Sequence, residues 1–189
     1  MPGTTIGHNL ALGYAGKVSR NPFNKINARQ VMSILNGSGV EAQPVIPFGA
    51  TVVTNVDNTY SRFGATGSGV STPVLANFAG IAVSEVKQSM TYGYGPSVSS
   101  GQFEPNMPCD VLQAGTTTVI CADGTPVANG AVYITTIAGG AIAVGDIVCA
   151  VNPTGGGTAI LLTNAKFTNG KQDAATGITE IVLLTQLNA

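Results

Sequence analysis

The run CDVLQAGTTTVICA, residues Cys109–Ala122, decides the fold class of this 189-residue chain. It holds two short segments rich in Val, Thr, Ile and Cys, and Ala114-Gly115 separates them. Strand-forming residues on both sides of a glycine-containing turn are typical of a β-hairpin. We therefore expect strands over Cys109–Gln113 and Thr116–Ala122, joined by a turn at Ala114-Gly115.

The same alternation of short strands and turns extends from Pro44 to the end of the chain. Runs rich in Val, Ile, Thr and Tyr are separated by Gly, Pro, Asn and Asp, which favour turns. Eight runs at this spacing predict a mainly β fold, either a β-barrel or a sandwich of about eight short strands. Besides the two runs above, they cover residues 50–55, 80–86, 131–137, 146–151, 158–163 and 178–184.

Residues 1–43 follow a different pattern. The first 20 residues show no sustained periodicity and predict an extended N-terminal arm. After them, Asn27 suits a helix N-cap, Gln30 suits the reciprocal position of a capping box, and Gly37 suits the position after the last turn. These signals predict one short helix over residues 27–36, so we divide the chain into a basic arm with a helix, residues 1–43, and a β-rich body, residues 44–189.

Charge is divided unevenly between the two parts. The first 30 residues contain four basic side chains and no Asp or Glu, whereas the rest contains four basic and nine acidic ones, so an arm of +4 is attached to a body of −5. Only 9% of all residues are charged, against about 25% in typical soluble domains. Such a surface favours a protein that works in contact with copies of itself or with a partner. The candidate binding residues, for an acidic protein surface, are Lys17, Arg20, Lys25 and Arg29.

No catalytic, metal or cofactor motif accompanies this pattern. The one histidine, His8, lies in the arm, so a Ser-His-Asp or Cys-His site would need the arm to fold back over the body. The run Gly64–Gly69 has the spacing of a dinucleotide motif in reverse order. The carboxylates are scattered singly among turns and strand ends, where Asp commonly bonds to nearby backbone. We expect no enzyme activity, no cofactor and no metal.

Nucleic acid and membranes are also disfavoured as partners. Four cations with a single aromatic residue among them, attached to an acidic body, make a weak footprint for a polyanion. No stretch approaches the roughly 20 apolar residues of a membrane-spanning helix. The N-terminal residues lack the order of a signal peptide, so we expect the protein to be made in a cytoplasm and kept there or assembled into a particle there.

The three cysteines, Cys109, Cys121 and Cys149, form no C-x-x-C pair and indicate neither a disulfide framework nor a zinc site. In the predicted hairpin Cys121 falls on the opposite face from Cys109, which disfavours a bridge between them. We expect three buried free thiols, although the sequence leaves their state open.

Several runs together resemble a known family. They are Ile46–Val53 (IPFGATVV), Phe78–Val83 (FAGIAV) and Pro108–Gly115 (PCDVLQAG) leading into Thr116–Cys121, followed in order by Gly130–Thr135, Gly145–Val148, Ala165–Thr168 and Gly177–Leu184. Over about two-thirds of its length the chain resembles the head decoration, or structural cement, proteins of tailed bacteriophages. The shared patterns are strands and turns and carry no catalytic signature.

The resemblance implies a non-enzymatic auxiliary capsid protein on the outside of the virion head. Such proteins commonly form homotrimers at local three-fold positions, bind the major capsid protein and tie its neighbouring subunits together, which stabilises the shell. The helix expected over residues 27–36 has no counterpart in the family pattern. A tail or spike adhesin remains the alternative, but the absence of Trp and the 6% aromatic content favour cement.

Overall fold

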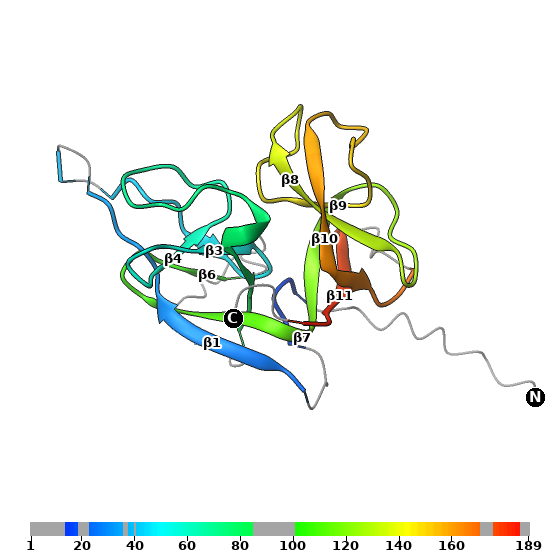
Figure 1. The fold of residues 1–189 in the computed structure, drawn as a ribbon, viewed down its shortest axis with the longest axis horizontal. Helices are drawn as coiled ribbons and strands as arrows, with labels where there is room; N and C mark the ends of the chain where they lie inside the picture. The colour runs from blue at the N-terminus through cyan, green and yellow to red at the C-terminus, as the bar shows by residue number, and fades with distance from the viewer. Residues whose placement is uncertain are drawn as a thin grey trace, which may run out of the picture.

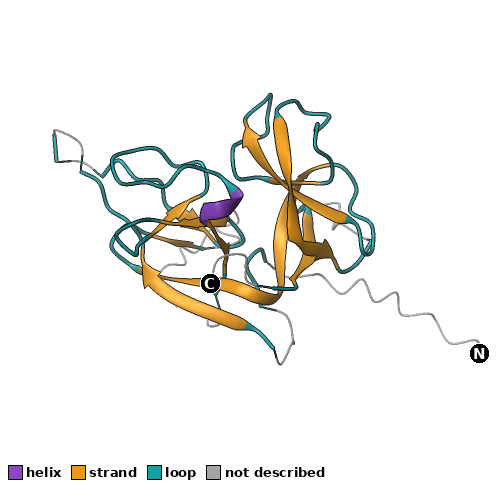
Figure 2. Cartoon of the chain, in the orientation of Figure 1, coloured by secondary structure: helices purple, strands orange, loops and turns teal. Residues whose placement is uncertain are grey.

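The computed structural model describes residues 14–18, 23–35, 38–39, 41–84, 101–170 and 176–185. Within these ranges the chain is almost entirely β-structure, with one 3-10 turn, η1 (Leu75–Asn77), as its only helical element (Figure 2). The mainly β fold expected from the sequence is confirmed. Figure 1 shows two lobes side by side, with the long strand β7 (Pro108–Asp123) passing from one into the other.

The C-terminal lobe is a closed β-barrel. Its strands are the second half of β7, β8 (Ala131–Ile137), β9 (Ile147–Val148), β10 (Thr158–Phe167) and β11 (Ile178–Leu183). They pair in the order β7, β11, β10, β8, β9 and back to β7, so that no edge remains open among them. β9 runs parallel to β7 and the other pairs are antiparallel. The interior is filled by side chains that are 0% exposed, among them Val119, Val132, Ile134, Leu162 and Ile181.

The N-terminal lobe is a curved sheet built on the first half of β7. β1 (Lys25–Gln30) pairs with one edge of β7 and β5 (Phe78–Ala82) with the other. β5 continues to β3 (Thr51–Thr54) and β4 (Tyr60–Arg62), while the short strands β2 (Ile46–Pro47) and β6 (Gln102–Phe103) pair separately.

The far ends of this curved sheet meet. Val31, directly after β1, forms a parallel bridge with Tyr60 of β4, and the Met32 amide donates a hydrogen bond of 2.8 Å to the Tyr60 carbonyl. A separate apolar cluster, which includes Val31, Val52, Tyr60 and Val111, fills the space inside. The lobe is therefore a second, partly closed barrel.

The hairpin predicted at Ala114-Gly115 is wrong. β7 continues without a turn through both residues, because its first half pairs with β1 and its second half with β11. Gly115 has φ +124°, a backbone conformation open mainly to glycine, and it lies where β7 passes from one lobe to the other. The glycine therefore accommodates a bend within a strand and does not end one.

The helix predicted over residues 27–36 is also wrong. Residues 25–30 form β1, and no helix follows among residues 31–35. A ten-residue helix is only marginally stable by itself, whereas β1 gains a full antiparallel ladder with β7 and places Ile26 against the main core. Tertiary pairing therefore overrides the local capping signals.

The described part of residues 1–43 packs on the body. Ala15 is 1% exposed, Lys17 bridges to Ser84 and Val18 bridges to Thr117. The Thr118 hydroxyl donates to the Tyr14 carbonyl over 2.6 Å, which fixes this segment to β7. Residues 1–13 of the expected arm lie outside the described residues, and the division of the chain at residue 43 stays a prediction.

Candidate interaction surface

The structure separates the four candidate binding residues. Lys25 and Arg29 both lie on β1 and line the same groove. Lys17 is exposed and lies at its bridge to Ser84, and it does not line that groove. Arg20 lies outside the described residues. The sequence-based cluster is therefore reduced, in the structure, to a pair on one strand, and the capsid-binding role of all four stays a prediction.

Lys25 and Arg29 border a hollow of about 670 Å³, which we name the basic groove. One wall is β1, and the other is formed by the end of β3, the turn after it and the segment around η1. The lining residues are Lys25–Asn27, Arg29, Thr54–Val56, Ser71, Ala76–Asn77 and Gln113. These include two cations and no carboxylate, so the described lining carries a positive charge.

The wall opposite β1 is held by a buried asparagine. Asn55 is 3% exposed, and its side-chain amide donates to the hydroxyls of Ser61, at 2.8 Å, and Thr59, at 3.0 Å. Its carbonyl oxygen accepts a hydrogen bond of 2.9 Å from the Ser71 amide. One side chain thus ties the end of β3 to β4 and to the loop before η1. The groove is a preformed feature of the fold.

Asp57 is the carboxylate nearest in sequence to the groove lining, and it is engaged within its own turn. It accepts hydrogen bonds from the Thr59 amide, at 3.1 Å, and from the Thr59 hydroxyl, at 2.6 Å. This is the local backbone-bonding role expected for Asp in turns. Its neighbour Val56 is 98% exposed at the rim of the groove.

Arg29 is oriented by an aromatic ring beneath it. Its guanidinium carbon lies 5.3 Å from the centre of the Tyr60 ring, in the range of a cation–π contact that contributes about 0.5–1 kcal/mol near a surface. Tyr60 is 0% exposed. Burial raises the pKa of its hydroxyl, and the nearby Arg29 charge opposes part of that rise. A guanidinium held in this way is arranged in advance for a two-point contact with a carboxylate.

Arg29 also lines a second, smaller hollow beside β1. This hollow of about 340 Å³ is formed with Ala28, Gln30, Asn106 and Pro108. The Gln30 side-chain amide lies 3.3 Å from the Asn106 carbonyl, to which it donates. The strand β1 therefore presents polar groups on both of its faces.

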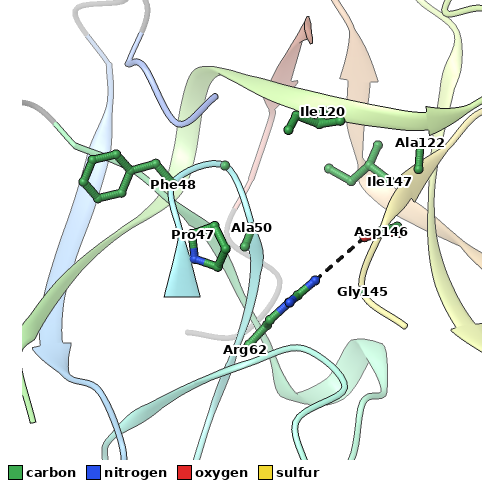
Figure 3. A pocket seen from close by; sticks show the side chains of 10 residues that line it. Pro47, Phe48, Ala50, Arg62, Ile120, Ala122, Gly145, Asp146 and Ile147 are labelled. Atoms are coloured by element: carbon green, nitrogen blue, oxygen red, sulfur yellow. Dashed lines mark ion pairs between the residues drawn. The ribbon is translucent and has the colours of Figure 1, made fainter. Parts of the chain in front are cut away.

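A smaller pocket lies where the two lobes meet (Figure 3). It has a volume of about 180 Å³ and is lined by Pro47, Phe48 and Ala50 from the first lobe and by Ile120, Ala122 and Ile147 from the barrel. Arg62 reaches across it toward Asp146, and their side chains form a 4.0 Å ion pair that is partly exposed. The Thr51 hydroxyl also donates to the Gly145 carbonyl over 2.6 Å.

The polar contacts in this pocket link the two lobes. The Asp146 carboxylate also accepts a hydrogen bond of 2.8 Å from the Ala143 amide. Sequence reasoning missed the pairing of Arg62 with Asp146, which lie 84 positions apart and share no motif.

Two further carboxylates, those of Asp123 and Glu41, hold loops in place by accepting hydrogen bonds from backbone amides. Asp123 accepts from the Thr154 amide at 2.8 Å, and Glu41 accepts from the Ser33 hydroxyl and from the amides of Ile34 and Gln43. These hydrogen bonds, led by that from Ser33, lower the pKa of Glu41. Among the described residues, no group of three His, Cys, Asp or Glu side chains is placed to hold a metal ion.

Of the expected buried thiols, Cys109 and Cys121 are buried, whereas Cys149 is half-buried; none of the three is in a disulfide. In the part of the chain that the structure describes, no helix is both long and apolar enough to cross a membrane.

Comparisons with known proteins give one family and one fold. A family model described as "Structural cement protein (E217 gp24/Pam3 gp6)" matches residues 2–184. A chain in the solved structure titled "The capsid of Myoviridae Phage XM1" is similar in fold, with a TM-score of 0.55 and 20% identity over 92% of this chain and 89% of that chain. A search of curated proteins finds no match.

Proposed function

Because the chain belongs to the phage structural cement protein family, it is a structural protein of a phage particle, and we propose that it binds the outside of the head and ties neighbouring major capsid subunits together. The observation that carries this proposal is the family match, which spans residues 2–184 and therefore includes both lobes. Binding at subunit boundaries would reinforce the shell without any chemical step.

The basic groove is the proposed contact with the shell. Lys25 and Arg29 would pair with carboxylates of the major capsid protein, and a role of Lys17 and Arg20 in binding the capsid stays a prediction from the sequence. An exposed ion pair contributes only about 0.2–1 kcal/mol. Tight attachment would therefore depend on several contacts per molecule and on the many copies that act together on one head.

Self-association into homotrimers is part of the proposal. Support comes from the low content of charged residues and from large apolar side chains that remain exposed on the barrel lobe. Their exposed fractions are 51% for Ile120, 61% for Ile137, 49% for Val151 and 43% for Leu161. Contacts between copies would cover such side chains.

A non-enzymatic role agrees with the chemistry of the hollows. The basic groove holds two cations, and no carboxylate, histidine or cysteine lines it. The carboxylate that lines the pocket between the lobes is paired with Arg62. Among the described residues, the lining of neither hollow places a serine or cysteine beside a histidine or a carboxylate.

Co-sedimentation with undecorated phage heads tests the proposal. Purified protein is mixed with heads at low and at high salt, and the copies bound per head are counted. We expect saturable binding at a copy number set by head symmetry, with part of the affinity lost as salt screens the groove. Absence of binding at both salt concentrations would overturn the proposal and favour a surface adhesin, for which a glycan screen is the next assay.

A further inference from the structure

Two of the three cysteines lie next to each other in the barrel lobe. The sulfur atoms of Cys121, on β7, and Cys149, directly after β9, are 3.5 Å apart. The two segments run parallel, with Cys121 paired to Ile147, and the Cys149 amide donates to the Asp123 carbonyl over 3.2 Å. Residues 28 positions apart are thereby fixed side by side on neighbouring backbone segments.

The two sulfur atoms are in contact but are not bonded to each other. A disulfide needs sulfur atoms about 2.05 Å apart on β-carbons about 3.5–4.5 Å apart. The two sulfur atoms, at 3.5 Å, would have to approach each other by about 1.5 Å to form that bond. The third cysteine, Cys109, lies in the other half of β7 and packs in the cluster of the N-terminal lobe.

The two thiols differ in their access to solvent. Cys121 is 4% exposed, whereas Cys149 is half-buried. Burial raises the pKa of both thiols, and the hydrogen bond between them favours the charged form of Cys149 at the expense of Cys121. A reagent in solution would therefore react with Cys149 first, and the more buried Cys121 would react second, with the modified Cys149.

We propose that Cys121 and Cys149 form a disulfide site that small-molecule disulfides, such as oxidised glutathione, convert to a cross-link within the folded protein. The Cys149 thiolate attacks one sulfur of oxidised glutathione, and the S–S bond of the reagent breaks. The attacked half stays on Cys149 as a mixed disulfide, and the other half leaves and takes up a proton to become a glutathione thiol. The Cys121 thiolate then attacks the Cys149 sulfur and displaces the second glutathione thiol. Two electrons pass from the protein thiols to the reagent, and their two protons end on the two glutathione molecules.

The cross-link would join two strands of the barrel where few residue pairs connect them. β9, which closes the barrel, has two residues, and it pairs with β7 and with β8 through two residue pairs each. The long ladders, such as the six pairs between β7 and β11, lie elsewhere in the ring. A bond from Cys121 to Cys149 would join the two sides of the β7–β9 seam directly, and it does not depend on where the protein acts.

Mass spectrometry after mild oxidation tests the inference. Native protein is incubated with oxidised glutathione, and free thiols are then alkylated before the intact mass and the peptides are measured. We expect a product that has lost two hydrogen atoms, holds one alkylated cysteine at Cys109, and yields a peptide linking Cys121 to Cys149. From the usual effect of a cross-link over such a loop, the melting temperature is expected to rise by roughly 5–15 °C and to return on reduction.

Variants of each cysteine supply the controls. Cys109→Ser is the matched control and is expected to form the same cross-link, whereas Cys149→Ser is expected to form none. If a variant does not fold, the peptide map of the wild-type protein alone decides the question. The inference is overturned by glutathione that stays on Cys149 without a cross-link, by two unmodified thiols in folded protein, or by a link that involves Cys109.

Discussion

Replacement of Gly115 by alanine probes the point at which β7 passes between the lobes. Gly115 has φ +124°, and a β-carbon built there would lie 2.1 Å from the side-chain oxygen of Asn24. That oxygen accepts a hydrogen bond of 3.2 Å from the Thr116 amide, and Asn24 would have to move. Backbone strain of about 1–3 kcal/mol and a lost hydrogen bond of about 1 kcal/mol are offset by about 0.5–1 kcal/mol from the stiffer unfolded chain.

The expected net loss is therefore about 1–3 kcal/mol, which corresponds to a fall in melting temperature of roughly 2–12 °C for a chain of this size. Thermal unfolding followed by circular dichroism measures it. Gly39→Ala is the matched control, because Gly39 also has positive φ, +75°, but nothing lies within 4 Å of its added β-carbon. Equal melting temperatures for the two variants would refute the idea that Gly115 is required by crowding at the bend.

Three further predictions concern single side chains. In Tyr60→Phe, the free energy of unfolding is expected to stay the same or to rise by up to about 1 kcal/mol in a urea titration, since the buried hydroxyl has no hydrogen-bond partner among the described residues; a loss above that size would contradict this account of Tyr60. Arg62→Gln is expected to lower the free energy of unfolding by less than about 1 kcal/mol, because its 4.0 Å ion pair with Asp146 is partly exposed; a larger loss in the same titration would make the pair a principal joint. Burial raises the pKa of Cys121 to about 12, and the hydrogen bond with Cys149 adds to the rise. The thiol's contribution to stability is therefore complete below its unfolded pKa and declines above it. The melting temperature is therefore expected to fall between about pH 9 and about pH 12, less steeply in Cys121→Ser than in the wild type, and equal slopes would contradict this.

The β class of the fold follows from local sequence. Short runs of β-branched residues between turn-forming residues predicted the strands of the barrel at 131–137, 158–163 and 178–184, and β8, β10 and β11 occupy these positions. The pattern predicts these strands correctly because each strand has one face in the core. Apolar and polar residues therefore alternate along its sequence. The closure of the barrel follows from pairings between distant strands, which composition does not specify.

The two errors have a common physical cause. Ala114-Gly115 has the residues of a turn, and residues 27–36 have the caps of a helix. In the structure Ala114-Gly115 lies within β7, and residues 27–30 pair with β7 as part of β1. In each case a partner more than 60 positions away supplies backbone hydrogen bonds that local preference does not anticipate. Local signals worth about 1 kcal/mol are outweighed by a six-residue ladder.

The candidate surface was only partly predictable. The sequence singled out Lys25 and Arg29 by their charge, but it placed both in a basic N-terminal arm, with Arg29 on a helix. The groove exists because β1 folds against β7 and faces Asn55 and η1, which the chain reaches much later. The contact of Arg29 with Tyr60 and the nearness of Cys121 to Cys149 likewise depend on the tertiary fold alone.

The most direct test of the proposed role compares two variants in binding to undecorated heads. Lys25→Gln combined with Arg29→Gln removes both cations of the basic groove, and Lys166→Gln removes an exposed cation from β10, away from the groove. Circular dichroism first establishes that both variants are folded. With about 0.2–1 kcal/mol for each ion pair, the double variant is expected to bind each site roughly 2- to 30-fold more weakly at low salt and to lose much of its salt dependence, while Lys166→Gln binds as the wild type does. Unchanged affinity and salt dependence in the folded double variant would contradict the claim that the basic groove holds the shell.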